Sequence, residues 1–119
     1  MTTYVYIAIN NRGLIKIGST IDPIDRQARF DSVPKNRRNA NMKIQKVVPL
    51  HFEGRAYEWA VESLLRYDLN TYQVTHKTMD TFEFNGAFFK PAVYIKNFVR
   101  KVEKAELILC KTKTTGHLL

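Results

Sequence analysis

The chain has 119 residues, 45% of them hydrophobic, which suits one domain with one modest core. Its composition argues against several classes of protein: we expect no membrane-spanning helix and no signal peptide, and the single cysteine, Cys110, excludes an intrachain disulfide and a cysteine-based zinc site. The formal net charge of +8 at pH 7 favours a polyanionic partner such as nucleic acid, and a lone cysteine suits the reducing cytoplasm.

Two short apolar segments, residues 4–9 and 14–18, alternate with a period of two around the turn signal Asn10-Asn11-Arg12-Gly13. Alternation puts Tyr6 on the face opposite the valine and isoleucine side chains, and it puts Lys16 on the same face as Tyr6. We therefore predict a hairpin in which Tyr6 and Lys16 are opposite or diagonal neighbours, about 5–8 Å apart.

A helix is predicted to begin at Asp22-Pro23, because aspartate caps helices well and proline at the first helical position loses no hydrogen bond. Along this helix, Arg26, then Arg29 or Phe30, and then Val33 fall on one side at spacings of three and four residues. The helix is expected to end before Pro34, since the residue before a proline avoids the helical conformation.

The segment from Pro34 to Met42 is a polar loop rich in asparagine, lysine and arginine. Its cations have no acidic residue among them, and such like charges repel one another unless an anion is near. Two interpretations stay open, a solvated loop and a phosphate-binding loop. The cations in question are Lys35, Arg37 and Arg38, together with Lys43 directly after the segment.

A third strand is predicted over residues 42–52, with Pro49 indicating an edge strand or a bulge. Its large apolar residues share one parity and so one predicted face: Met42, Ile44, Val48, Leu50 and Phe52. A second helix is predicted over residues 55–69, with Glu58 and Glu62 flanking its apolar stripe. That stripe consists of Tyr57, Val61, Leu64 and Leu65.

The remaining segments are predicted to be a polar loop over residues 70–79 that holds His76, a short strand over 80–84, and a helix that begins at Pro91. The final helix has one apolar side and one basic side. Its inward residues are predicted to be Tyr94, Ile95, Phe98, Val99 and Val102, and its outward residues Lys96, Arg100, Lys101 and Lys104.

This order of elements predicts an α+β fold with a small three-stranded antiparallel sheet flanked by helices and a C-terminal helical extension. We expect one domain over residues 1–110, with a core over about 3–70 and an extension over 71–110. Residues 111–119 are expected to form a weakly ordered tail.

The hairpin and the helix after it resemble the GIY-YIG endonuclease superfamily over roughly the first 70 residues of the chain. Tyr4-Val5-Tyr6 matches the first element of the motif, and Lys16-Ile17-Gly18 matches the second, with lysine in place of the second tyrosine, as in phage, viral and some restriction-enzyme branches. Arg26 matches the catalytic arginine of the family. Phe30 stands where many members carry a histidine. The resemblance also implies the predicted fold, a three-stranded antiparallel sheet between helices.

The resemblance implies a metal-dependent hydrolysis of phosphodiester bonds and a role for each matching residue. Tyr6 would act as the base, Lys16 beside it would favour the phenolate or hold the attacking water, and Arg26 would bind phosphate. Glu62 is implied as the ligand of one Mg²⁺ or Mn²⁺ ion, with Glu58 as its rival.

The predicted partner is DNA, with RNA left open, and no membrane is expected as a partner. The side chains predicted to bind nucleic acid are Arg29, Lys35, Arg37, Arg38, Lys43 and His76. One site cuts one strand at a time, so double-strand cleavage would need a homodimer or two successive events. The alternative hypothesis is a catalytically inactive nucleic-acid-binding module or an interaction protein on the same scaffold.

Overall fold

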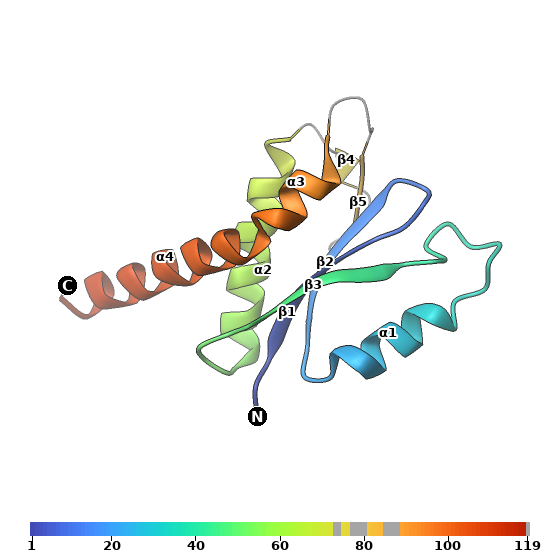
Figure 1. Cartoon of the computed structure of the whole chain (residues 1–119). Coiled ribbons are helices and arrows are strands. Elements are labelled where there is room, and N and C mark those ends of the chain that lie inside the picture. Colours follow the sequence, from blue (N-terminus) through green and yellow to red (C-terminus); the bar gives the residue numbers. More distant parts are fainter. Residues whose placement is uncertain (73–74, 77–80, 85–88, 119) are drawn as a thin grey trace.

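The computed structural model of the chain describes residues 1–72, 75–76, 81–84 and 89–118, with side chains for all of these except 75–76 and 111–118. Five strands and four helices are interspersed along the described part of the chain (Figure 1). They are β1 (Tyr4–Ile9), β2 (Leu14–Thr20), α1 (Pro23–Asp31), β3 (Lys43–Pro49), α2 (Arg55–Asn70), β4 (Thr75–His76), β5 (Thr81–Glu83), α3 (Pro91–Lys96) and α4 (Phe98–Leu118). No helix among the described residues is long and apolar enough to cross a membrane.

The strands form one antiparallel sheet in the order β3-β1-β2-β5-β4, which confirms the α+β class and the predicted edge position of β3. The prediction of three strands was wrong. The short strand expected over 80–84 is β5, and it pairs with the outer edge of β2, whose backbone groups would otherwise lie unpaired. The other addition is β4, which lies within the segment 70–79 that was predicted to be a loop.

The register of the first two strands confirms the predicted hairpin. Tyr6 pairs with Gly18, and Ala8 pairs with Lys16. Tyr6 and Lys16 are therefore diagonal neighbours on one face of the sheet, since their cross-strand partners are two residues apart.

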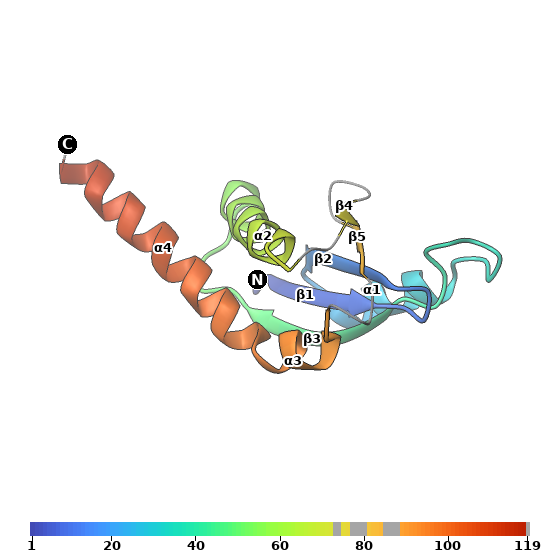
Figure 2. The ribbon, with the colours of Figure 1, turned by 90° about the horizontal axis from the view of Figure 1, so that it is seen from above.

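Helices cover both faces of this sheet, and the two faces have separate apolar cores (Figures 1 and 2). The larger core joins β1 and β2 to α2, α3 and α4, and its members on the strands include Val5, Ile7, Ile15 and Ile17. The smaller core lies under α1 and consists of Tyr6, Ala8, Leu14, Phe30 and Met42, with Ile44 packed against it. Side chains of odd and even number on the hairpin thus enter different cores, as alternation predicted.

One predicted face was wrong, because β3 contains a bulge. Ile7 pairs with Lys46 and Ala8 pairs with Ile44, so Gln45 is an extra residue on β3. Past the bulge the alternation is reversed. Of the residues predicted to share one face, Met42 and Ile44 join the core under α1, Val48 and Leu50 join the larger core, and Phe52 lies beyond the strand and is 52% exposed.

The C-terminal helix predicted from Pro91 is interrupted at Asn97, so that α3 and α4 are separate helices. The residues predicted to face inward do so: Tyr94, Phe98 and Val102 are buried in the larger core, and Ile95 and Val99 pack against it. The backbone of α4 continues as a helix to Leu118, and its last turns extend away from the rest of the molecule (Figures 1 and 2).

Lys101 was predicted to face outward, and that prediction was wrong. Its Nζ donates hydrogen bonds to Asp68 Oδ2 at 2.8 Å and to the Tyr72 hydroxyl at 3.0 Å, and it lies 4.7 Å from the ring centre of Tyr94. Burial lowers the pKa of Lys101, but Asp68 and Tyr72 outweigh this effect, and the net pKa is raised. Lys101 therefore ties α4 to the C-terminal end of α2 as a cation.

Candidate functional site

The centre of the candidate site is the pair formed by Tyr6 on β1 and Gly18 on β2. Tyr6 is fully buried, and its ring lies across Gly18. A Cβ atom on Gly18 would lie 2.5 Å from the Tyr6 hydroxyl oxygen and 2.8 Å from Cζ, closer than real Cβ atoms come to other atoms. The glycine of the motif is therefore required by the tyrosine that faces it, and not by a special backbone conformation.

Helix α1 brings two more side chains to this pair. The helix is fixed at its start by Asp22, whose Oδ1 accepts a hydrogen bond from the backbone N–H of Asp25 at 3.0 Å. One turn later, the guanidinium carbon of Arg26 lies 6.0 Å from the ring centre of Tyr6. Phe30 meets the Tyr6 ring edge to face at 5.9 Å. Such contacts stabilise the cation and the rings through the aromatic quadrupole.

Lys16 completes the cluster from β2, with its Nζ 5.4 Å from the ring centre of Phe30. Phe30, in the position where a histidine was expected from the resemblance, thus contacts both Tyr6 and Lys16. Lys16 and Arg26 are half-buried, whereas Tyr6 has no exposed surface. A phosphate can therefore reach the two cations directly, while a role for Tyr6 as a base requires a water molecule to reach its hydroxyl.

Glu62 lies outside this cluster, on the opposite face of the sheet. It is 8% exposed, and its Oε2 accepts a hydrogen bond from Ser19 Oγ at 3.3 Å. Ser19 follows Gly18 on β2, and alternation points its side chain toward α2. The structure thus brings together Tyr6, Lys16 and Arg26 on one face of the sheet, whereas Glu62 lies toward the other face, where it bonds to Ser19.

Glu58, the rival metal ligand, faces the same end of the hairpin as Glu62. Its Oε1 accepts a hydrogen bond from Thr3 Oγ1 at 2.8 Å. The two carboxylates are one helical turn apart and, with the hydroxyls of Thr3 and Ser19, form a set of oxygen donors of the kind that Mg²⁺ and Mn²⁺ prefer. Within the described part of the chain, no group of three or more histidine, cysteine, aspartate or glutamate side chains could hold a metal ion. The donors fit a metal held by one or two carboxylates and a substrate phosphate.

The basic loop is held against the hairpin turn by two residues that sequence analysis did not single out. The side-chain amide of Asn10 donates to two backbone carbonyls of the loop, at 3.0 Å each. The guanidinium of Arg12 donates to the carbonyl of Arg37 at 2.7 Å and to that of Lys35 at 2.9 Å. These bonds fix the loop backbone, so its cations are presented on a defined surface. The sequence predicted a turn at Asn10 and Arg12 but gave no sign that their side chains would bind the loop.

Three of the cations predicted to bind nucleic acid already have a carboxylate partner. Arg29 pairs within α1, with a residue four positions earlier, whereas the partners of Lys43 and Arg38 lie on α1 and β5, so the composition of the loop did not reveal them. The ion pairs are Arg29 with Asp25 at 2.9 Å, Lys43 with Asp31 at 2.7 Å, and Arg38 with Glu83. The hydrogen bond from Lys43, helped by one from Gln27, lowers the pKa of Asp31.

Three further residues were predicted to contact nucleic acid: Lys35, Arg37 and His76. Lys35 and Arg37 are exposed, and neither forms an ion pair with another described residue. His76 is in β4, where it pairs with Phe82, but its side chain lies outside the described part of the structure. Lys35 and Arg37 are therefore the loop cations best placed to meet a phosphate.

A second polar cluster, missed by sequence analysis, joins the end of β3 to α2 and α4. Glu106 is 5% exposed and accepts hydrogen bonds from the Tyr57 hydroxyl at 2.6 Å and from the backbone N–H of His51 at 2.8 Å. His51 Nδ1 lies 2.8 Å from the other carboxylate oxygen. Burial raises the pKa of Glu106, but these hydrogen bonds outweigh it, and the pKa lies below its ordinary value.

Replacing Glu106 with glutamine should lower the free energy of unfolding by about 1–3 kcal/mol at neutral pH, because a buried charged acceptor of three hydrogen bonds is lost. Since folding lowers the pKa of Glu106, its contribution is present above the ordinary glutamate value of 4.5 and is lost as the pH falls through the folded value. The difference between wild type and Glu106→Gln should therefore shrink in acid. Urea unfolding followed by circular dichroism measures it.

Glu103→Gln is the matched control, because Glu103 is an exposed glutamate on the same helix. It should change stability by no more than about 0.5 kcal/mol. Equal stability of Glu106→Gln and wild type at neutral pH would contradict the structural role assigned to this carboxylate.

The geometry thus defines a cationic site on one face of the hairpin and a pair of carboxylates on the other face. Comparison of the chain with protein-family models, with curated proteins and with solved structures gives no match. The function is therefore argued from the residues themselves.

Proposed function

We propose that the chain is a metal-dependent endonuclease of the GIY-YIG type that hydrolyses DNA phosphodiester bonds. The observation that carries the proposal is the cluster of two partly exposed cations, Lys16 and Arg26, built on the buried Tyr6–Gly18 pair. Each of its members matches the motif by position, and the close contact between Tyr6 and Gly18 gives a physical reason for the glycine.

In this proposal, Arg26 binds two oxygens of the scissile phosphate with its planar guanidinium, and Lys16 adds a second positive charge or holds the attacking water. Both cations stabilise the negative charge that grows on the phosphate in the transition state. A Mg²⁺ or Mn²⁺ ion held by Glu62, with Glu58 beside it, would supply Lewis acidity toward the phosphate and the leaving oxygen.

The proposed substrate is DNA, with RNA left open. The net charge of +8 and the exposed cations Lys35 and Arg37 provide the electrostatic attraction to a phosphate backbone. The loop that carries them is anchored beside the hairpin by Asn10 and Arg12, so a bound strand would be held near the cluster. A single site cuts one strand, and double-strand cleavage would need a homodimer or a second event.

Nicking of supercoiled plasmid tests the proposal. The purified wild-type protein should nick the plasmid in the presence of Mg²⁺ or Mn²⁺. Nicking should stop when EDTA removes the metal ion. Glu62→Ala should reduce the rate by at least about 100-fold if this carboxylate holds the metal. Nicking that continues unchanged in EDTA and in Glu62→Ala would contradict the assignment.

A nucleic-acid-binding module without catalysis is the second candidate function. Two observations favour it: Tyr6 has no exposed surface, and Glu62 lies on the opposite face of the sheet from Tyr6 and Lys16. This candidate predicts that wild type retards plasmid in a gel, with a strong salt dependence, but does not nick it with either metal. Metal-dependent nicking that Glu62→Ala abolishes decides against it.

A further inference from the structure

Helix α2 carries a stripe of exposed side chains on the side turned away from the sheet. Arg55, Trp59, Ser63 and Tyr67 follow one another at a spacing of four residues, and all are exposed. Trp59 is 55% exposed and Tyr67 is 75% exposed. These two large aromatic residues lie about 12 Å apart along the helix axis. Their side chains are open to solvent and are not part of either apolar core.

The stripe itself carries one cation, Arg55, and each carboxylate of α2 already has a partner. Glu58 accepts from Thr3, Glu62 accepts from Ser19, and Asp68 pairs with Lys101 on α4. Glu53, just before the helix, forms an ion pair with the amino group of Met1. Arg55 is exposed and forms no ion pair with another described residue. An anion approaching the stripe therefore meets no free carboxylate on α2.

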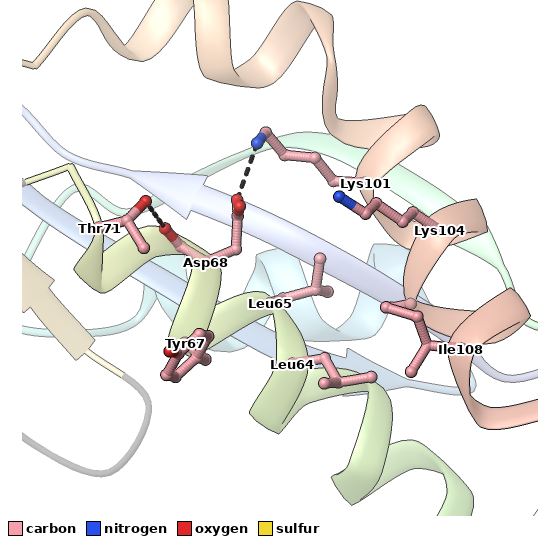
Figure 3. Close-up of a pocket in the computed structure, with 9 residues that line it drawn as sticks. Leu64, Leu65, Tyr67, Asp68, Thr71, Lys101, Lys104 and Ile108 are labelled. Carbon is pink, nitrogen blue, oxygen red and sulfur yellow. Dashed lines mark hydrogen bonds and ion pairs between the residues drawn. The ribbon is translucent and has the colours of Figure 1, made fainter. Parts of the chain in front are cut away.

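Each aromatic residue of the stripe also stands beside a hollow that has a cation at its edge. Arg55, Ala56 and Trp59 line an open hollow of about 440 Å³. Tyr67 lies at the groove between α2 and α4, whose volume is about 330 Å³ and whose apolar floor includes Leu65. Figure 3 shows this groove, with the Asp68–Lys101 ion pair across it and Lys104 extending from α4.

We propose that this stripe binds single-stranded nucleic acid. Bases stack on the indole of Trp59 and on the ring of Tyr67, and phosphates contact Arg55 and Lys104. Trp59 and Tyr67 are eight positions apart, which is about 12 Å along the helix axis and matches roughly three to four stacked base steps. Stacking without base-edge hydrogen bonds makes the surface tolerant of sequence. The inference does not depend on cleavage, because α1 and α2 cover opposite faces of the sheet.

Trp59 is the single tryptophan of the chain, so its fluorescence reports on this surface alone. In EDTA, an oligothymidylate of about 12 nucleotides, within the range of single-strand binding sites, should quench the emission of the full-length wild-type protein. Measured by anisotropy of a labelled oligonucleotide, Trp59→Ala and Tyr67→Ala should each weaken binding about 10-fold, as expected for the loss of one stacked base.

Two control variants show whether weaker binding is caused by the loss of a stacking ring, or by misfolding or an unspecific loss of affinity. Trp59→Phe keeps an aromatic ring and should retain binding within about threefold. Val93→Ala removes an apolar side chain of α3 that is 59% exposed and should leave binding unchanged. Trp emission that stays constant while the oligonucleotide saturates would overturn the proposal, and so would wild-type affinity in Trp59→Ala. A change in emission with anionic lipid vesicles but not with the oligonucleotide would overturn it in favour of a membrane surface.

Discussion

Arg26→Ala should slow metal-dependent plasmid nicking by at least about 100-fold, because removal of one charged donor to the transition state typically has an effect of this size. Arg26 is the partly exposed cation that α1 places over the Tyr6 ring, and its guanidinium can bind two phosphate oxygens at once. The fold should survive the change, because the cation–π contact contributes only about 0.5–2 kcal/mol. The initial rate of nicking measures the effect, with circular dichroism as the check on folding.

Two further variants show whether the effect belongs to the position or to charge in general. Arg26→Lys keeps the charge but loses the planar fork, so its rate should fall between those of wild type and Arg26→Ala. Arg100→Ala removes an exposed cation from α4 and should leave the rate within about threefold of wild type, since distant surface charges are screened by salt. Equal losses in Arg26→Ala and Arg100→Ala would mean that only net charge matters.

Gly18→Ala should destabilise the fold by about 1–3 kcal/mol, the usual cost of forcing an added carbon into a filled core. The added Cβ would lie 2.5 Å from the Tyr6 hydroxyl oxygen, so the ring must move. Because Arg26 and Phe30 both contact that ring, the same substitution should also impair nicking. Urea unfolding at equilibrium measures the loss of stability.

A double-mutant cycle with Tyr6→Leu tests the cause. If the contact with the Tyr6 ring makes Gly18→Ala unfavourable, its effect in the Tyr6→Leu background should fall to about 0.5 kcal/mol or less, because the atoms in the way are gone. An undiminished effect in that background would show that the backbone of β2, and not Tyr6, requires the glycine.

The hairpin is the part of the molecule that the sequence determined best. Strict alternation over Val5 to Ile9 and Ile15 to Ile17 divided the side chains between two faces, and the register confirmed Tyr6 and Lys16 as diagonal neighbours. The start of α1 was equally predictable, because the Asp22 cap and the proline after it are local signals that need no tertiary contact. Such features depend only on residues that are close together in the sequence.

Tertiary structure decided the features that depend on distant segments. The bulge at Gln45 reversed the alternation of β3, and no local signal marked that position. The ion pair between Arg38 and Glu83 joins residues far apart in the sequence, so the composition of the loop could not reveal it. Glu106 was unremarkable on its helix until folding brought His51 and Tyr57 to it.

The candidate site divides in the same way. Its residue types and their order followed from the sequence, because the motif lies in two adjacent strands and the helix after them. The position of Glu62 did not, because the side of the sheet on which α2 packs is set by burial of Val61, Leu65 and Leu69 in the larger core. Local periodicity thus determined the cations that gather around Tyr6, whereas the separation between those cations and the carboxylates was decided by long-range packing of apolar surface.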